Sequence, residues 1–359
     1  MTGLINGPRK GRGALSNPAG RFDRTAVDGV DDGWFREETA ASLVTHVEPD
    51  KARSVITHND SPDVGFDSSI NPYRGCEHGC IYCFARPSHA YVGLSPGLDF
   101  ETRLFYKADA AKLLEAELAH PRYVCKPIML GINTDAYQPL EKTLRVTRSI
   151  LEVLHRCRHP VTFVTKSALI LRDIDLIADL ARDRLASVAV SLTTLDPETK
   201  RTLEPRTASP QARLKVIREL SQAGVPTSVL VAPIIPMVTD HELESILEAA
   251  VDAGARNASY VMLRLPYEVK TLFREWLAEH HPLRAKHVMS IIQSLRGGRD
   301  NDPNFGTRMS GIGPYAQLIK SRFNVACRRL GINGARDRDL VTTLFRAPRP
   351  DSPQLEFSL

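Results

Sequence analysis

The sequence has no long hydrophobic run and few cysteines. No apolar stretch among its 359 residues approaches the roughly 18 residues that cross a bilayer, so we expect a soluble protein without membrane contact. The six cysteines, the polar, basic start and the lack of a secretory signal argue against a secreted disulfide scaffold and favour a cytoplasmic location. The net charge of +5 is mild but unevenly distributed. Residues 284–329 carry nine Lys or Arg against two acids, a balance that can hold phosphates, although most basic faces are merely solvated.

Three of the six cysteines, Cys76, Cys80 and Cys83, lie within eight residues in a CxxxCxxC spacing. Thiolates favour zinc, copper(I) and iron–sulfur centres, and so short a loop brings three of them together. Three ligands would hold a four-iron four-sulfur cluster and leave one iron without a protein ligand. The alternative is a Cys3His zinc site that takes His78 or His89 as its fourth ligand. Zinc loops usually come as two separated ligand pairs, and no second pair follows here, so we favour the cluster.

The cysteine loop, with the aromatic Tyr82 just before its last cysteine, resembles the cluster loop of the radical S-adenosylmethionine (SAM) superfamily. The resemblance implies an enzyme whose cofactors are a 4Fe-4S cluster and SAM. In that chemistry the reduced cluster cleaves SAM to methionine and a 5′-deoxyadenosyl radical, which takes a hydrogen atom from the substrate. It also implies an electron donor such as flavodoxin or ferredoxin.

From Phe66 onward, short β-branched runs alternate with helical periods. Together with a strand just before Cys76 they make six βα units, so we predict the α/β class and a partial (β/α)6 barrel of the TIM type. The cluster loop would follow the first strand, at the carboxyl end where barrel active sites are built. The other expected strands are 126–132, 161–165, 187–193, 226–232 and 258–263, and the helices between them are 140–155, 172–181, 211–223 and 241–253.

The composition divides the chain into four parts. We expect a basic, irregular N-terminal arm over residues 1–59, the barrel over 60–266, a helical extension over 267–345 and a flexible tail over 346–359. In the extension, apolar periodicity predicts helices at 270–279, 283–295 and 315–330.

The tail ends in Gln354-Leu355-Glu356-Phe357-Ser358-Leu359. This resembles the Gln-Leu-x-apolar-x-Leu peptide by which bacterial repair and replication proteins dock on the sliding clamp. A frayed tail without a partner is the alternative.

Polar side chains follow the expected strands at the end where a barrel cofactor binds. Lys166 ends the third strand and can pair with a carboxylate, and Ser191 ends the fourth and can hydrogen-bond the same group. A solvated lysine and a capping serine are the alternatives. Tyr82 can face the adenine of the cofactor, and a packed loop aromatic is its alternative. Glu204 and Arg206 either form an ion pair or contact the ribose.

Several stretches resemble spore photoproduct lyase and its relatives. The resemblance implies that Lys166 and Ser191 contact the amino acid end of SAM and that Ala232 lies beside its adenosine part. The string 69–76 with Phe84-Ala85-Arg86 resembles more closely a bacterial subfamily related to that lyase. The matching stretches are Phe163-Val164-Thr165-Lys166, Val190-Ser191, Glu204-Pro205 with Thr207 and Pro210, and Val231-Ala232-Pro233-Ile234.

One position departs from the lyase pattern. The lyase has a hydrogen-donating cysteine at the end of its second strand, three residues before an aspartate, and here Ile132 occupies that place before Asp135. An isoleucine cannot donate a hydrogen atom as a thiol does. We expect the remaining cysteines to be buried small hydrophobes, and Tyr137 or another nearby tyrosine is the candidate relay. Those cysteines are Cys125, Cys157 and Cys327.

Three functions from different classes remain. The first is a radical SAM enzyme acting on DNA in a lyase-like, repair-related reaction. The second is a radical SAM enzyme that modifies RNA, a protein or a small molecule. The third is a non-catalytic metal-cluster module that binds nucleic acid. Lys166 and Ser191, in places that resemble those of cofactor contacts, favour the first two over the third.

Overall fold

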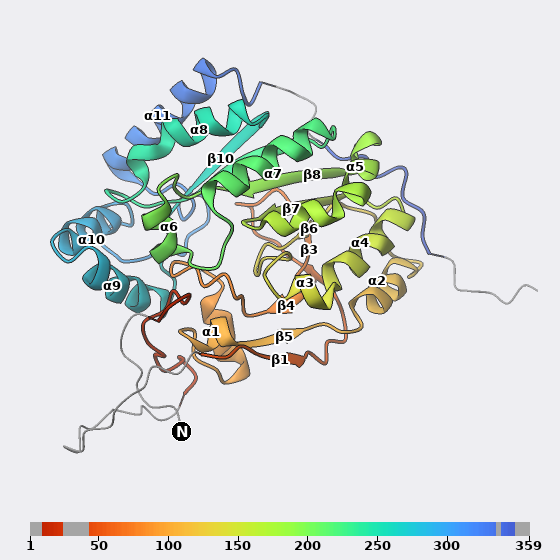
Figure 1. Cartoon of the computed structure of the whole chain (residues 1–359), viewed down its shortest axis with the longest axis horizontal. Helices are drawn as coiled ribbons and strands as arrows, with labels where there is room; N and C mark the ends of the chain where they lie inside the picture. The colour runs from red at the N-terminus through yellow and green to blue at the C-terminus, as the bar shows by residue number, and fades with distance from the viewer. Residues whose placement is uncertain (1–8, 24–42, 335–338, 349–359) are drawn as a thin grey trace, which may run out of the picture.

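The computed structural model describes residues 9–23, 43–334 and 339–348 (Figure 1). Part of the expected N-terminal arm and the whole clamp-like peptide, residues 354–359, lie outside them. Within the described ranges, no helix is both long enough and apolar enough to cross a membrane.

A seven-stranded sheet forms the centre of the protein, with strand order β10-β9-β8-β7-β6-β3-β2 (Figure 1). Its six strands from β3 to β10 are parallel to their neighbours, and β2 (Ile56–His58) pairs antiparallel with β3. The sheet ends at β10 and β2, so it is an open, partial barrel, and the predicted fold class is confirmed. The parallel strands are β3 (Ser68–Ile70), β6 (Ile128–Leu130), β7 (Val161–Thr165), β8 (Ala186–Ser191), β9 (Thr227–Ile234) and β10 (Asn257–Met262).

Helices follow β6, β7, β8 and β9 and cover the outer face of the sheet, as predicted (Figure 1). The expected helix over 140–155 is divided, because Arg145 has a left-handed φ of 53° and separates α3 (Glu141–Leu144) from α4 (Val146–Arg156). The other main covering helices are α5 (Ile174–Arg182), α7 (Pro210–Gln222) and α8 (Leu243–Asp252). Shorter elements are η1 (Arg86–Val92), α1 (Asp99–Thr102), α2 (Ala110–Leu118), η2 (Ala168–Asp173), α6 (Pro197–Leu203) and η3 (Asp240–Glu242).

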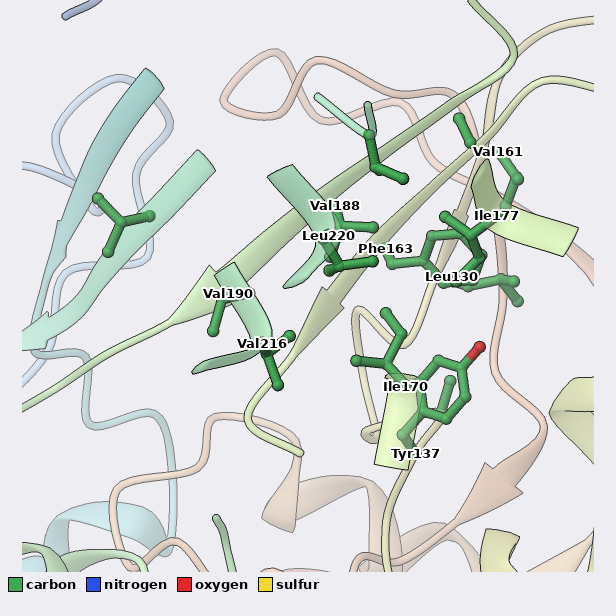
Figure 2. Close-up of a cluster of buried hydrophobic side chains, with 14 of the residues drawn as sticks. Leu130, Tyr137, Val161, Phe163, Ile170, Ile177, Val188, Val190, Val216 and Leu220 are labelled. Carbon is green, nitrogen blue, oxygen red and sulfur yellow. The ribbon is translucent and has the colours of Figure 1, made fainter. Parts of the chain in front are cut away.

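Alternate side chains of the central strands pack beneath these helices (Figure 2). Val161 and Phe163 of β7 are buried, whereas Val164, on the opposite face of the same strand, borders a cavity. Because successive residues of a strand face opposite sides, this alternation separates the hydrophobic core from the interior of the barrel. The core beneath the helices includes Leu130, Val188, Val190, Ile177, Val216 and Leu220.

A second, smaller sheet also packs on the barrel. β1 (His46–Pro49) pairs with β5 (Arg103–Tyr106), and β5 pairs with β4 (Tyr73–Arg74), to make a second, three-stranded sheet. Gly13 lies so close to the cysteine loop that a Cβ atom there would stand 1.9 Å from the carbonyl oxygen of Gly79. Part of the expected N-terminal arm therefore belongs to the packed protein.

The three helices predicted after the barrel are confirmed as α9 (Val269–His280), α10 (Ala285–Ser294) and α11 (Gly313–Arg329). Much of the positive charge of α11 is paired. Arg322 donates to Glu244 at 2.6 Å and Arg329 pairs with Glu248, and both acids lie on α8. The basic composition of this region therefore overstates its free positive charge.

Candidate active site

A cavity of about 890 Å³ lies at the carboxyl ends of the parallel strands. The predicted site residues that border the cavity are Cys76, Cys80, Tyr82, Cys83, Lys166, Ser191 and Ala232. The structure therefore brings together residues that lie far apart in the sequence. The other two predicted site residues, Glu204 and Arg206, do not border the cavity, although both are close to residues that do.

The cysteine loop is held by a fully buried arginine. Arg86 donates to the carbonyl of Cys80 at 2.9 Å, to that of Gly79 at 3.1 Å and to the carboxylate of Glu101 at 2.5 Å. Gly79 has a φ of +66°, and a Cβ there would come within 2.7 Å of Glu101, so only glycine fits this turn. A buried ion pair and a glycine turn thus set the path of the loop between its first two cysteines.

The donor set fits a thiolate-bound cluster better than a single zinc ion. Cys76 and Cys80 are buried, and burial raises the pKa of Cys80 to about 12, so these thiols need a bound cation to lose their protons. His78 lies 3.3 Å from Asp135 and His89 lies 2.8 Å from the carbonyl of Arg103, so both histidines have other partners. Across the described residues, no three His, Cys, Asp or Glu side chains converge on a point that could hold one metal ion.

Asp135 connects the cysteine loop to the end of β7, a role that sequence reasoning missed. Its carboxylate accepts from Thr165 at 2.8 Å and from the amide of Lys166 at 2.8 Å, and it lies 3.3 Å from His78. Burial alone would raise the pKa of Asp135, but His78 and the amides of Lys166 and Tyr137 outweigh it and lower the pKa to about 2. The ionised carboxylate therefore sets the backbone position from which Lys166 enters the cavity.

Lys166 lies over the ring of Tyr82, with its ammonium 5.9 Å from the ring centroid. Burial alone would lower the pKa of Lys166, but Cys80 and Glu204 outweigh it and raise the pKa. The lysine is therefore charged at neutral pH and available to pair with an anionic group in the cavity.

Glu204 is fully buried behind the cavity wall and pairs with Arg213, not with Arg206. Thr193 donates to Glu204 at 2.8 Å, and the hydroxyl of Tyr82 also donates to it. Burial would raise the pKa of Glu204, but Arg213 above all lowers it to about 2.

Arg206 instead pairs with Glu77 at 3.1 Å, so the ion pair weighed between Glu204 and Arg206 is wrong. Arg213 also donates to the carbonyl of Ser191 at 3.0 Å. No motif marks Arg213 in the sequence, since it is one of two arginines in the amphipathic helix α7.

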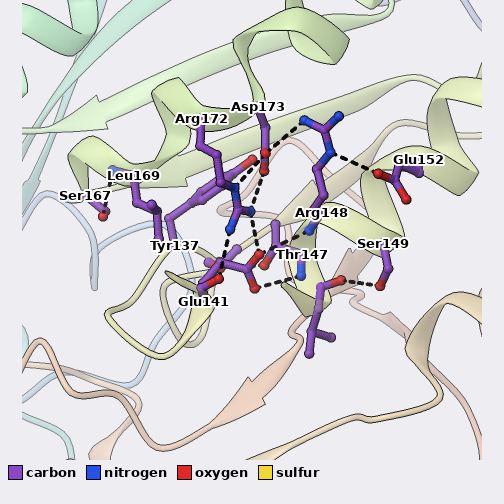
Figure 3. A network of polar contacts seen from close by, with 12 residues as sticks. Tyr137, Glu141, Thr147, Arg148, Ser149, Glu152, Ser167, Leu169, Arg172 and Asp173 are labelled. Atoms are coloured by element: carbon purple, nitrogen blue, oxygen red, sulfur yellow. Dashed lines mark hydrogen bonds and ion pairs between the residues drawn. The ribbon is translucent and has the colours of Figure 1, made fainter. Parts of the chain in front are cut away.

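Ile132 borders the cavity at the place where the lyase pattern has its cysteine. Tyr137 does not border it, because its side chain is fully buried and points toward Asp173 (Figure 3). Burial first, and then the carboxylates of Asp173 and Glu141, raise the pKa of Tyr137. The buried position of Tyr137 therefore argues against it as the hydrogen relay.

The cysteines outside the loop meet the prediction in part. Cys157 and Cys327 are buried in the main core, as expected. Cys125 is partly exposed and lies outside that core, so the prediction that it is buried is wrong. None of the three borders the cavity.

A family model described as the Radical SAM superfamily matches residues 70–250, which run from the last residue of β3 past β9 and include the cysteine loop. This chain belongs to the radical SAM superfamily. It is an enzyme of that class, and its cofactors are a 4Fe-4S cluster and SAM. Membership disfavours the non-catalytic module among the three functions weighed above.

This radical SAM enzyme is similar in sequence to proteins that are named as uncharacterised. One from Mycobacterium tuberculosis is 37% identical over 272 residues, which cover 72% of this chain and 80% of the relative. Another, from Methanocaldococcus jannaschii, is 28% identical over 194 residues, which cover 54% of this chain and 69% of the relative. Neither name assigns a reaction.

The fold is similar to that of spore photoproduct lyase. A mutant of that lyase, solved with bound SAM and dinucleoside spore photoproduct, superposes with a TM-score of 0.54 at 13% identity, covering 79% of this chain and 78% of the lyase chain. A second structure, of the lyase complexed with dinucleoside spore photoproduct, gives a TM-score of 0.54 at 14% identity over the same shares. At this identity the likeness shows the fold of this radical SAM enzyme and not its substrate.

Proposed function

We propose that this radical SAM enzyme abstracts a hydrogen atom from a nucleotide of DNA, in a repair-related reaction. The observation that carries the proposal is the cavity of about 890 Å³ that joins the three cysteines to Lys166, Ser191 and Ala232. Cavities that hold a small ligand range from about 300 to 1,000 Å³, so this one is at the large end of that range. The lyase of similar fold, whose structure holds a dinucleoside photoproduct, supports DNA as the substrate class.

In this proposal Cys76, Cys80 and Cys83 hold the cluster, and the charged Lys166 pairs with the carboxylate of SAM. Ser191 lies at the end of β8, where its hydroxyl donates to the carbonyl of Ala232 at 3.2 Å. The two residues form the wall beside the amino acid and adenosine parts. When bound, the two cofactors together supply a 5′-deoxyadenosyl radical. The protein residues orient the cofactor and exclude water from the cavity.

Glu204 and Arg206 enter the proposal as supporting residues. Glu204 holds Tyr82 and Arg213, and Arg213 in turn holds the backbone of Ser191. Arg206 holds Glu77, the residue after the first cysteine. Neither borders the cavity, so we assign both to positioning the cofactor contacts and not to direct contact with SAM.

The end of the reaction differs from that of an enzyme with a cysteine hydrogen donor. Ile132 borders the cavity in place of that cysteine, and no cysteine other than the three of the loop borders it. Tyr260, within β10, does border the cavity and carries a transferable phenolic hydrogen. The product of the reaction therefore need not be that of a lyase.

A second candidate is a radical SAM enzyme that modifies RNA, a protein or a small molecule. The pairing of Arg322 and Arg329 with acids of α8 favours the protein and small-molecule substrates of this candidate, because it reduces the positive surface available to the phosphates of a nucleic acid. Deuterium-labelled DNA distinguishes the two candidates.

The test is anaerobic turnover with strong reductant and deuterated DNA, either irradiated with ultraviolet light or untreated. We expect 5′-deoxyadenosine to form faster with irradiated DNA and to contain deuterium from it. Cys83→Ala should abolish cleavage of SAM, whereas Cys157→Ala, which changes a core cysteine, should retain it. Cleavage that is indifferent to DNA, without deuterium transfer, would support the second candidate.

Two partners complete the proposal. A flavodoxin or ferredoxin would supply the electron that this chemistry needs. The peptide Gln354-Leu359, which lies outside the described residues, would dock on the sliding clamp and bring the enzyme to DNA. Titration of the clamp with a peptide of the last residues tests the docking, and no binding at high micromolar concentration would discard it.

A further inference from the structure

Two arginines border the cavity outside the set of cofactor residues. Arg264 follows β10 by two residues, and Arg308 lies in the loop before α11. Their hydrogen bonding differs: one arginine is paired within the protein, and the other is not.

Arg308 is paired within the protein. It donates to the carboxylate of Asp63 at 2.5 Å and to the hydroxyl of Ser61 at 2.5 Å. The other oxygen of Asp63 accepts from the amide of Gly306 at 2.6 Å. Both carboxylate oxygens of Asp63 therefore accept hydrogen bonds from the loop that carries Arg308.

Arg264 has no such partner. Its Nε atom is buried without a hydrogen bond, and one Nη atom has only the weak acceptor sulfur of Met309, 3.7 Å away. Burial first, and then Arg308, lower the pKa of Arg264, while Asp63 offsets them in part. An incompletely paired guanidinium in a cavity wall is unfavourable by itself and becomes favourable when an anion binds beside it.

The backbone around the two arginines is held in place. Arg296 is buried, and its guanidinium donates to carbonyls of both segments that carry them. The site is thus organised before a ligand arrives, which lowers the entropic cost of binding. The four acceptors are the carbonyls of Thr307, Arg308, Met262 and Leu263.

Exposed aromatic rings stand beside both arginines. Phe84, the residue after the last cysteine of the loop, borders the cavity with 45% of its surface exposed, and Arg264 lies 5.7 Å from its ring centroid. Phe305 is 55% exposed, and Arg308 lies 4.4 Å from its centroid. Cationic groups with stacking platforms are the combination that binds single-stranded nucleic acid, in which phosphates meet the charges and bases meet the rings.

We propose that Arg264 binds a backbone phosphate of a single DNA strand and that Phe84 stacks a base of that strand at the entrance to the cavity. This inference rests on the proposed function and names the form of its substrate. A guanidinium binds phosphate through two parallel hydrogen bonds, and among the described residues the Nη atoms of Arg264 have no acceptor other than the weakly accepting sulfur of Met309. A strand held here would lie next to the cysteine loop, because Phe84 directly follows Cys83.

The experiment measures fluorescence anisotropy of a labelled thymidine decanucleotide with the reconstituted full-length protein, kept anaerobic, at several salt concentrations. Arg264→Gln should weaken binding roughly tenfold and reduce the salt slope by about one. Phe84→Leu should also weaken it roughly tenfold, with an unchanged slope. Arg299→Gln, which changes an exposed arginine outside the cavity, should bind as the wild type does. A decanucleotide with an uncharged methylphosphonate backbone should bind to the wild type and to Arg264→Gln equally weakly.

Equal binding of the charged decanucleotide by wild type and Arg264→Gln would overturn the inference. So would an Arg264→Gln variant that binds DNA normally but loses affinity for SAM in equilibrium dialysis, because Arg264 would then belong to the cofactor site. The proposed function can fail separately. If Arg264→Gln weakens DNA binding but no deuterium passes from DNA to 5′-deoxyadenosine, the phosphate site stands and the proposed reaction is wrong.

Discussion

Replacement of Glu204 by glutamine tests the buried support behind the cofactor contacts. Glu204 is fully buried and shared by Arg213, Tyr82 and Thr193. The substitution keeps the shape of the side chain and removes its charge, so Arg213 remains buried without a counterion. Loss of one partner of a buried ion pair typically costs about 3–5 kcal/mol.

The lowered pKa, which has the same ion pair as its main cause, gives a similar value for this loss. A carboxyl pKa that falls from 4.5 to about 2 on folding corresponds to about 3 kcal/mol of stability at pH 7. This stability is present above pH 4.5, where the carboxyl is ionised in both states, and it is lost as the pH falls toward 2. At pH 3.5 about 2 kcal/mol should remain. For a chain of 359 residues, about 3 kcal/mol lowers the melting temperature by about 4 °C.

The assay is urea unfolding of wild type and Glu204→Gln at pH 7 and at pH 3.5. The matched control is Glu198→Gln in α6, the helix that ends just before Glu204, since Glu198 is exposed and pairs with Arg201 at the surface. The control should change stability by less than about 1 kcal/mol. If Glu204→Gln also changes stability by less than this, or if its deficit is the same at both pH values, the assignment of a buried, ionised Glu204 is refuted.

Two further predictions concern the cysteine loop and a buried histidine. Arg86→Met should hold less than half of the roughly four irons that wild type binds, because the carbonyls of Gly79 and Cys80 lose their hydrogen-bond donor. The control Arg103→Met, at an exposed position, should bind the full number of irons. Equal iron content in Arg86→Met and wild type would contradict the prediction. Burial lowers the pKa of His159 from 6.5 to about 4. Between pH 6.5 and about 4 the unfolded chain therefore binds a proton that the folded chain does not, and stability decreases as the pH decreases through this range. From pH 7.5 to 5 the wild type should lose about 2 kcal/mol that His159→Gln does not lose, and parallel losses in urea unfolding would show that His159 is not the cause.

The parallel strands and the cofactor wall could be predicted because their signals are local. β-branched runs such as Val161–Thr165 and the amphipathic helices after them follow from side-chain periodicity along the chain. Parallel strands end at one edge of a sheet, so the sequence predicts that Lys166 and Ser191 lie near each other. The cavity confirms that they share one wall.

Other features depend on contacts that no local pattern encodes. The left-handed backbone of Arg145 divides the helix expected over 140–155, and the sequence does not indicate it, because this position is not a glycine. Glu204 and Arg206 are two residues apart, yet one faces Arg213 in the interior and the other faces Glu77. Their separation made an ion pair between them plausible, and their opposite orientations exclude it.

The sequence by itself determined the chemistry of the cysteine loop, because the spacing of Cys76, Cys80 and Cys83 sets how three thiolates can share one cluster. Only the tertiary structure decided which charges are compensated. Arg308 meets Asp63 across 245 residues, whereas Arg264 is left with an unused donor in the cavity wall. Charge balance depends on distance in space, and the partners come from loops that only the folded barrel brings together.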